Sequence, residues 1–333
     1  MKPTQKIVLN HWLYGTHTIT EPVLIELIQS PILERLKHIE QHGTWQLHQS
    51  YKKTNRFTRY DHSIGVMLLL RHFGASIEEQ LHGLLHDISH TVFSHVADFL
   101  FGKTPGVHNY QDSRLKKAYQ LQGVNDILTK HGFLATHILN EKNFPLAERS
   151  LPDLCADRLD YSIQDPWGRT FDTVRPQDLL NNLLVFKKQF VFSSQYWAKR
   201  FATLYEKHNQ HVWCSIDQIA IYTLSAQMLR AALDEHIITK QELYTTDEYV
   251  VKKLQAAKHP TIQTLLKKIK TVKAREVTKA QADFWSTSKP RVVDPLFLRD
   301  GNVVRLTDVD TVYKKRIGIW KARIKKGFYI KLV

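Results

Sequence analysis

The chain has 333 residues, of which 43% are hydrophobic and 24% are charged. This is the composition of a globular protein that can bury one large core or one and a half domains. The chain has no apolar run long enough to span a bilayer, and its N-terminus lacks the apolar stretch of a secretory signal, so we expect a cytoplasmic protein without a membrane segment. Cys155 and Cys214 are isolated and form no CxxC pair, which argues against a disulfide framework or a cysteine-ligated zinc site.

The formal net charge is +15, and it is distributed unevenly. Residues 251–333 carry 21 Lys and Arg against 6 Asp and Glu, so they account for the whole excess, and residues 1–250 are balanced. We therefore predict a neutral first domain in residues 1–250 and a basic extension in residues 251–333 that is suited to phosphate-rich partners such as nucleic acid. A basic surface that serves only solubility is an equally open interpretation.

The first elements of the chain follow from its local patterns. Residues 6–20 mix β-branched and aromatic residues around a glycine, which predicts a short strand or hairpin. Residues 22–43 place apolar residues at three-and-four spacing on both sides of Pro31, which predicts two amphipathic helices. Residues 43–57 show no clear period and are expected to form a loop.

Two further helices are expected to form a hairpin. Asp61 is the expected N-cap of the first, which begins at His62 and ends near Gly74. Ser76 and Glu79 form the S-x-x-E pattern of a capping box in front of the second.

The remainder of the chain is also mostly helical by pattern. Helices are expected at 112–132, at 134–141 and at 151–163 with Pro152 near its start, and a helix capped by Asp217 lies among those expected between 175 and 250. Residues 186–197 alternate and are expected to form a hairpin beside the substrate cleft. Two helices flank His259–Pro260, and the residues after Ala282 read as short strands with a hairpin at Asp300-Gly301. The predicted fold is mainly α, with a small basic β-containing C-terminal region.

Candidate metal ligands concentrate between Arg56 and Asp98. His62 precedes the adjacent pair His86-Asp87 by 24 residues in a predicted helical hairpin. A neutral imidazole beside a carboxylate can hold one divalent cation and leave positions open for water, which indicates catalysis. Asp157 and Asp160, further along the chain, lie nearly one helical turn apart on the same side, so the spacing allows either to complete the set. Two histidines and two carboxylates suit Mn, Fe, Ni, Co, Zn or Mg.

Four ordered blocks strengthen this interpretation: PILERLKHIEQHG (31–43), RYDHSIGV (59–66), LLHDISHTVFSH (84–95) and DRLDYSIQD (157–165). Together they resemble the deoxynucleoside triphosphate triphosphohydrolase branch of the HD superfamily of metal-dependent phosphohydrolases. The resemblance covers residues 22–165 and implies an HD-domain helical core and a homo-oligomer. By this resemblance the metal ligands would be His62, His86, Asp87 and Asp157; the catalytic and phosphate shell would include His90, His95 and Asp98; Arg59 and Arg158 would face the phosphates; and Gln41, Tyr161 and Asp165 would face the sugar.

The chain departs from the family after the second helix of the hairpin. The family has a His-Glu pair that supplies a catalytic histidine, whereas this chain has GVHNYQD. His108 is the nearest candidate for that catalytic role, and Tyr110 is an alternative occupant of the position. His82, one turn before His86, has no counterpart in the family, and we interpret it as structural.

Three functions are therefore open. The resemblance implies a metal-dependent phosphohydrolase that converts deoxynucleoside triphosphates to nucleoside and triphosphate. A phosphodiesterase or nuclease that acts on nucleic acid through the basic C-terminal region is the second hypothesis. The third is a catalytically weakened, metal-containing binding protein for nucleotides or nucleic acid.

Overall fold

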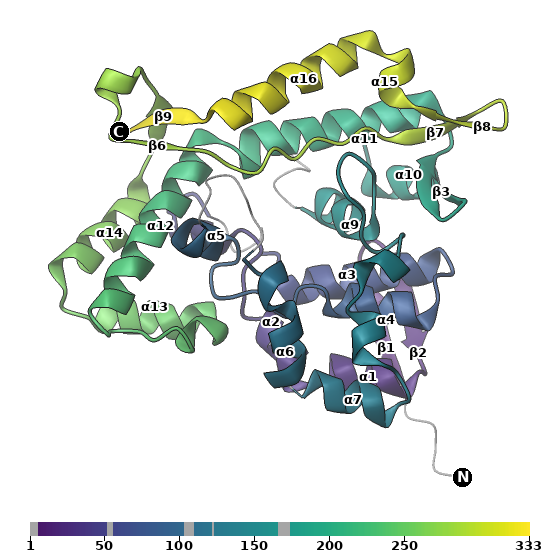
Figure 1. The fold of residues 1–333 in the computed structure, drawn as a ribbon, viewed down its shortest axis with the longest axis horizontal. Helices are drawn as coiled ribbons and strands as arrows, with labels where there is room; N and C mark the ends of the chain where they lie inside the picture. Colours follow the sequence, from purple (N-terminus) through teal and green to yellow (C-terminus); the bar gives the residue numbers. More distant parts are fainter. Residues whose placement is uncertain (1–5, 52–55, 103–109, 122, 166–173) are drawn as a thin grey trace.

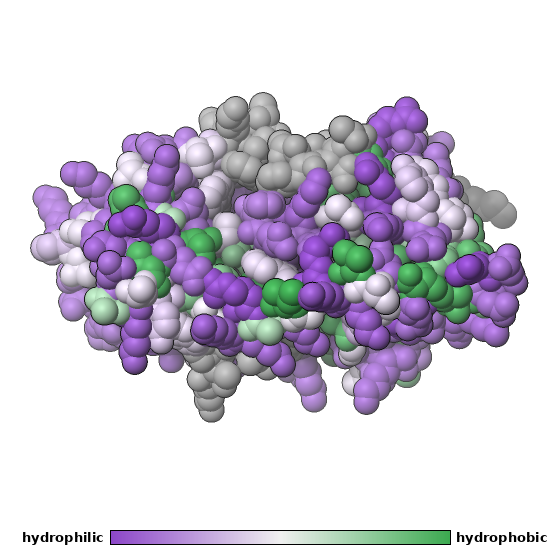
Figure 2. Space-filling view, turned by 90° about the horizontal axis from the view of Figure 1, so that it is seen from above, coloured by the Kyte–Doolittle hydropathy of each residue, from purple (hydrophilic) through white to green (hydrophobic). Residues whose placement is uncertain are grey.

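The computed structural model describes residues 6–51, 56–102, 110–121, 123–165 and 174–333. It is mainly helical with three small sheets, which confirms the predicted fold class (Figure 1). Within the described residues, no helix has both the length and the apolar character to cross a membrane. The surface on the α16 side is largely hydrophilic, with hydrophobic residues in separate positions (Figure 2).

The first part of the chain confirms the predicted hairpin and helix pair. Strands β1 (Ile7–His11) and β2 (Gly15–Ile19) pair antiparallel. Helices α1 (Pro22–Ile28) and α2 (Pro31–Leu36) each begin with a proline, whose missing N–H costs nothing in the first turn. The expected loop that follows contains a short 3-10 helix, η1 (Gly43–Leu47).

Helix α3 (Arg59–His72) begins three residues before the predicted position, so the expectation that Asp61 is its N-cap was wrong. Thr58 is the N-cap: its hydroxyl accepts from the Asp61 N–H, and the Asp61 carboxylate accepts from the Thr58 N–H at 2.9 Å. Asp61 is therefore the third helical residue of a reciprocal capping box. The earlier start places Arg59 and His62 together in the first turn.

Helix α4 (Ile77–Leu85) confirms Ser76 as an N-cap, but the predicted capping box is incomplete. The Glu79 carboxylate accepts instead from the backbone N–H groups of Leu146 and Ala147, at 2.6 and 3.1 Å. A long-range backbone contact has replaced the local one, and it ties α4 to the segment before α9.

Two other predicted helix starts were also wrong. Helix α9 (Ala156–Gln164) begins after Pro152, which lies in the preceding turn, so Asp157 falls in the first turn of the helix. Helix α12 (Ile216–Asp234) is capped by Ser215 and not by Asp217, whose carboxylate accepts from the Ala274 N–H at 2.7 Å. In both cases local composition indicated the helix but not the residue at which it begins.

The other described helices are α5 (Val96–Phe101), η3 (Asp112–Arg114), α6 (Leu115–Leu121), α7 (Val124–Lys130), α8 (Ala135–Ile138), η4 (Glu141–Asn143), α10 (Pro176–Asn181), α11 (Gln195–His208), η6 (Asn209–Trp213), η7 (Glu242–Tyr244), α13 (Asp247–Ala256), α14 (Pro260–Thr271), η8 (Lys279–Gln281) and α15 (Leu306–Val309).

The C-terminal region contains one long helix that the sequence did not predict. Residues 311–326 form α16 (Thr311–Lys326), although RIGIWKAR was expected to be a strand. One face of α16 packs against buried clusters of the protein through residues at helical spacing: Tyr313, Ile317, Trp320 and Ile324. This packing offsets the strand preference of the β-branched residues in the segment. The predicted hairpin at Asp300-Gly301 is confirmed, and both residues have positive φ, as a type I′ turn requires.

Strands from distant parts of the chain form the two larger sheets. The predicted hairpin of β3 (Leu183–Phe186) and β4 (Gln189–Phe192) is present, and β4 pairs in parallel with β7 (Leu296–Arg299), which pairs in turn with β8 (Asn302–Arg305). This hairpin contributes no described residue to the large cleft, so its expected place beside the cleft was wrong: Phe190 packs on Phe73 in the core. The third sheet joins β5 (Ala274–Glu276), β9 (Phe328–Leu332) and β6 (Phe284–Ser286).

Candidate metal centre and cleft

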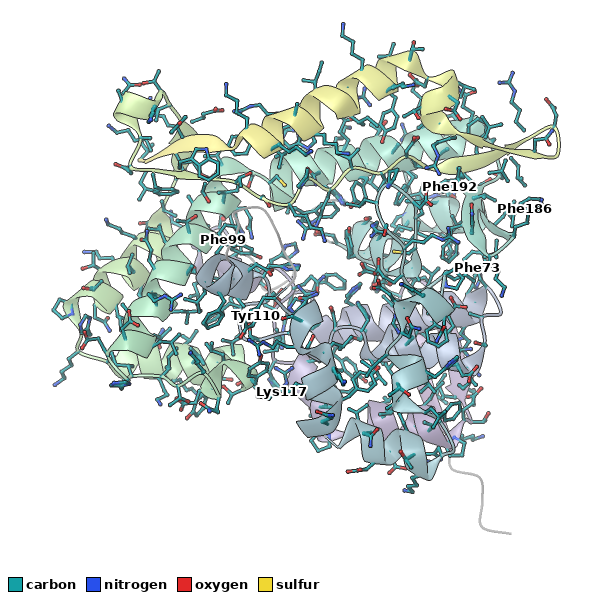
Figure 3. The ribbon with its side chains drawn as sticks, viewed as in Figure 1. Phe73, Phe99, Tyr110, Lys117, Phe186 and Phe192 are labelled. Atoms are coloured by element: carbon teal, nitrogen blue, oxygen red, sulfur yellow. The ribbon has the colours of Figure 1, made fainter. Side chains whose placement is uncertain are left out.

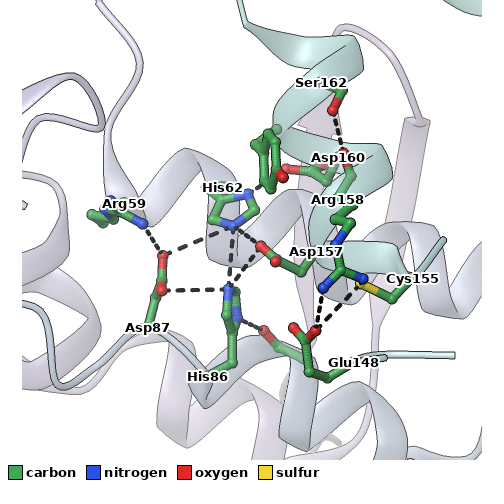
Figure 4. Close-up of polar contacts among 12 residues, drawn as sticks. Arg59, His62, His86, Asp87, Glu148, Cys155, Asp157, Arg158, Asp160 and Ser162 are labelled. Atoms are coloured by element: carbon green, nitrogen blue, oxygen red, sulfur yellow. Dashed lines mark hydrogen bonds and ion pairs between the residues drawn. The ribbon is translucent and has the colours of Figure 1, made fainter. Parts of the chain in front are cut away.

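The four predicted metal ligands meet where three helices converge. His62 comes from the first turn of α3, His86 and Asp87 follow the end of α4, and Asp157 comes from the first turn of α9 (Figure 4). The Nε2 atom of His62 lies 3.2 Å from Nε2 of His86, 2.9 Å from Oδ1 of Asp157 and 3.8 Å from Oδ2 of Asp87. His86 Nε2 lies 3.5 Å from Asp87 and 3.6 Å from Asp157.

Hydrogen bonds behind the two histidines fix which nitrogen faces this centre. His62 donates from Nδ1 to the buried carboxylate of Asp160 at 2.7 Å, and His86 donates from Nδ1 to the Gly83 carbonyl at 2.7 Å. When a ring is neutral, its Nε2 lone pair therefore faces the carboxylates of Asp87 and Asp157. Metal-ligating histidines are usually held in this way by a carboxylate or carbonyl on the far nitrogen. The donor set fits a divalent cation.

The same groups shift one another's pKa values. Burial disfavours the ionised form of Asp87, but Arg59 and neighbouring histidines hold its pKa well below the usual range. Hydrogen bonds from His62 and His86 likewise outweigh burial and hold the pKa of Asp157 well below its usual range. Burial disfavours charge on His62, yet its bonds to Asp157 and Asp160 raise its pKa to about 10. The carboxylates of Asp87 and Asp157 are thus ionised at neutral pH, and they favour a positive charge beside them, whether on His62 or on a bound cation.

The two arginines expected to face phosphates line the cleft but are already paired. Arg59 donates to Asp87 at 2.7 Å and to Ser94 at 3.0 Å, and its Nη2 is buried without a hydrogen-bond partner in the described part of the chain. Arg158 donates to Glu148 at 3.1 Å and to the carbonyl of Asp153 at 3.0 Å. Both guanidinium groups are therefore held in place beside the centre (Figure 4).

His90, His95 and Asp98 lie on one side of the centre. His95 donates from Nδ1 to Asp98 at 3.0 Å, and its ring meets that of His90 edge to face at 5.1 Å. His90 Nε2 lies 3.2 Å from Asp87. Burial lowers the pKa of His90 to about 4 and that of His95 well below its ordinary value, and Arg59 adds to both shifts. Both rings are neutral at pH 7, and His95 lines the cleft.

The centre opens into a cleft of about 920 Å³. Gln41, Tyr161 and Asp165, expected at the sugar, all line it. Asp165 lies 3.3 Å from Nε2 of the buried His42 and accepts from Trp213 Nε1 at 3.1 Å. The hydroxyls of Tyr161 and Tyr205 are 2.8 Å apart. The cleft thus combines aromatic walls and fixed polar groups with the candidate metal ligands, and the ring of Tyr161 lies 6.1 Å from that of His62.

Comparison with known proteins identifies the family. The HD domain family model matches residues 59–161. The chain is 30% identical over 275 residues to the metal-dependent phosphohydrolase cns2 of Cordyceps militaris, which covers 80% of this chain and 78% of that protein. This chain belongs to the HD-domain metal-dependent phosphohydrolases. It is also 34% identical over 323 residues to the uncharacterized protein YdhJ of Bacillus subtilis, over 96% of this chain and 98% of that protein.

Two further likenesses are more limited. The crystal structure of a phosphohydrolase from Bacteroides thetaiotaomicron superposes with a TM-score of 0.64 at 18% identity, over 92% of this chain and 95% of that one, and supports the fold. The deoxynucleoside triphosphate triphosphohydrolase SAMHD1 of Danio rerio is 33% identical over 109 residues, which are 28% of this chain and 17% of that protein.

The candidates outside the central set have different positions in this HD phosphohydrolase. His108 lies outside the described residues. Tyr110 stacks on Phe101 of α5 at 4.8 Å and is not among the described residues that line the cleft (Figure 3). His82 donates to the Ile138 carbonyl at 2.7 Å, as expected of a structural histidine, and burial lowers its pKa to about 4.

Several residues of the site were not found from the sequence. The helical spacing indicates Asp160 only as a possible ligand, whereas it orients His62. Glu148, which holds Arg158, and Arg291, which lines the cleft, lie in no motif. Their positions depend on long-range packing, and no local pattern indicates them.

Proposed function

We propose that this HD phosphohydrolase cleaves deoxynucleoside triphosphates to nucleoside and inorganic triphosphate. The observation that carries the proposal is a cleft that combines the His and Asp donor set with guanidinium groups and aromatic side chains. Its volume of about 920 Å³ is in the range of cavities that enclose a ligand of nucleotide size. The partial identity with a deoxynucleoside triphosphate triphosphohydrolase supports the same substrate class.

We assign the candidate ligand set His62, His86, Asp87 and Asp157 to one divalent cation. Such a cation supplies Lewis-acid polarisation of a phosphate oxygen and eases the ionisation of water. Asp160 and Gly83 orient the two imidazoles toward it. Arg59 lies beside Asp87, and one of its buried nitrogens bonds to no described residue, which suits it to contact a phosphate oxygen.

His95 is the proposed proton carrier. Because its Nδ1 hydrogen is held by Asp98, its Nε2 is the basic nitrogen, and the low pKa leaves that nitrogen unprotonated at neutral pH. It can take a proton from the attacking water and return it to the 5′ oxygen of the departing nucleoside. The net reaction consumes one water and needs no other reactant.

Gln41, Asp165 and Tyr161 are proposed to meet the sugar, with Tyr205 and Trp213 as neighbouring aromatic walls. Asp165 is held by His42 and Trp213, so its carboxylate can accept from a sugar hydroxyl without reorganising. A fixed acceptor of this kind discriminates strongly between sugars, because a mismatched sugar leaves it unpaired.

The test is product analysis. Purified protein with added Mn²⁺ would be incubated with each deoxynucleoside triphosphate, each ribonucleoside triphosphate and single-stranded DNA, and the products would be separated by ion-exchange chromatography. The expected products are nucleoside and triphosphate from deoxynucleotides, with none from His86→Ala or Asp87→Ala. Release of monophosphate and pyrophosphate, or cleavage of DNA alone, would contradict the proposal.

The basic region bears on the nucleic-acid alternative. No residue of α16 is among the described residues that line the cleft, although this helix carries many of the C-terminal cations. A steep loss of activity with rising salt would indicate a polymeric substrate, because each phosphate contact releases a counterion. Activity on free nucleotides is expected to depend weakly on salt.

A further inference from the structure

A C-terminal segment crosses from β6 to β7 and lies against α16; we call residues 287–294 the strap (Figure 1). Hydrogen bonds hold both of its ends. The buried Thr287 hydroxyl donates to the Ile324 carbonyl, and the Tyr313 hydroxyl donates to the Val293 carbonyl at 2.7 Å. Asp294 donates its N–H to the carbonyl of Pro152 at 2.9 Å. The strap is therefore fixed between α16 and the turn before α9.

The middle of the strap contributes to the catalytic cleft. Ser288, Lys289 and Arg291 all line it. The thiol of Cys214 donates to the Lys289 carbonyl at 3.7 Å, which holds this part of the strap against the junction of η6 and α12. A segment of the basic extension thus lines the same cleft as the candidate metal ligands His86, Asp87 and Asp157.

Arg291 differs from the other guanidinium groups beside the centre. Arg59 is paired with Asp87 and Arg158 with Glu148, whereas half-buried Arg291 makes no hydrogen bond or ion pair with any described residue. Its electrostatic neighbours are Tyr161, Cys214, Tyr205 and Asp98. Of these only Asp98 has a carboxyl group, and it already accepts from His95 and from the Tyr110 N–H.

A guanidinium that is partly withdrawn from water and pairs with no anion of the described residues is destabilised, and a bound anion would offset that cost. A guanidinium fork matches two oxygens of a phosphate, and the charge-assisted bonds are stronger than neutral ones. We propose that Arg291 binds a phosphate group of the substrate, so that the basic C-terminal extension completes the phosphate-binding wall of the cleft. This inference rests on the proposed function for the identity of the substrate but not for the binding of phosphate.

The arrangement also gives α16 a role. Its Tyr313 and Ile324 hold the two ends of the strap, so the helix braces the segment that carries Arg291. The exposed cations of α16 are then not required to contact substrate.

The experiment compares the metal-loaded wild type with Arg291→Met, Arg291→Lys and Arg299→Met. Arg299 is exposed at the end of β7 and has the same charge outside the cleft, so it is the matched control. Binding of inorganic triphosphate would be measured by calorimetry, and KM and kcat would be measured for the best nucleotide. Loss of one charge-assisted contact predicts a Kd about 10- to 100-fold higher in Arg291→Met. Arg291→Lys is expected to show a smaller loss and Arg299→Met none.

The outcomes separate this inference from the proposed function. Wild-type Kd and KM in a folded Arg291→Met would overturn the role of Arg291 even if deoxynucleotides are hydrolysed. If no nucleotide is hydrolysed but Arg291→Met still weakens triphosphate binding, the role of Arg291 stands and the proposed substrate is wrong. If Arg291→Met does not fold, Arg291→Lys decides: unchanged triphosphate binding overturns the inference, and at least threefold weaker binding supports it.

Discussion

Asp160 offers the sharpest test of the proposed centre, because it touches no open part of the site and yet determines how His62 faces it. Its Oδ2 accepts from His62 Nδ1 at 2.7 Å, and its Oδ1 accepts from the Tyr14 hydroxyl at 2.7 Å and from Gln164 Nε2 at 2.6 Å. All three bonds are buried, so the carboxylate is fully engaged.

Asp160→Asn keeps the shape but removes one acceptor. If the new carbonyl faces Tyr14 and Gln164, the new amide donates toward His62 Nδ1 and moves the ring proton to Nε2, where it blocks the lone pair that faces the centre. If the side chain takes the opposite orientation, its new NH₂ group faces the NH₂ group of Gln164, and neither can accept the other's hydrogen. Either way one charge-assisted bond worth about 1.5–3 kcal/mol is lost. Metal affinity is expected to fall about 10- to 100-fold.

The assay is competition for Mn²⁺ against a chelator, with the melting temperature recorded for each protein. Asp157→Asn is the comparison, since it alters a proposed ligand and should lower affinity further. Wild-type Mn²⁺ affinity in a folded Asp160→Asn would refute the view that this carboxylate sets the His62 tautomer.

Three more outcomes are expected. His95→Gln and Asp98→Asn should each lower kcat by about 10²- to 10⁴-fold while retaining bound metal, and loss of metal in either would contradict a role in proton transfer alone. Burial raises the pKa of Glu40 to about 7, from an ordinary value of 4.5. Between these two pH values Glu40 binds more protons in the folded protein than in the unfolded protein. Its contribution to stability is therefore present below pH 4.5 and is lost as the pH rises to 7. Glu40→Gln should therefore become more stable relative to the wild type from pH 5 to pH 7.5, by up to about 3 kcal/mol in urea unfolding, and a difference independent of pH would argue against this. Chelation of the metal should lower the melting temperature of the wild type but not of His86→Ala, because only a bound ligand stabilises the native state by mass action.

Local patterns predicted more of the site than of the helix ends. The spacing of His62 and the His86-Asp87 pair placed these residues on one helical hairpin, and periodicity identified α1, α2, α13 and α14. Helix caps were less predictable, because Asp61, Glu79 and Asp217 make contacts that depend on neighbouring turns or distant segments. The C-terminal helix α16 was missed because its β-branched and aromatic residues suit a strand, whereas the Asp310 cap and the packing of Tyr313 and Ile324 favour the helix.

The amino-acid sequence by itself determined which residue types could form a metal centre, since imidazole and carboxylate chemistry is local to each side chain. It left Asp157 and Asp160 equivalent, because one helical turn separates them. Tertiary packing gives them different positions: α9 lies against α3 so that Asp157 meets His62 Nε2 and Asp160 meets Nδ1. The same packing brought Arg291 into the cleft from far along the chain. Such placements depend on contacts between distant segments, which the order of residues encodes only through the whole fold.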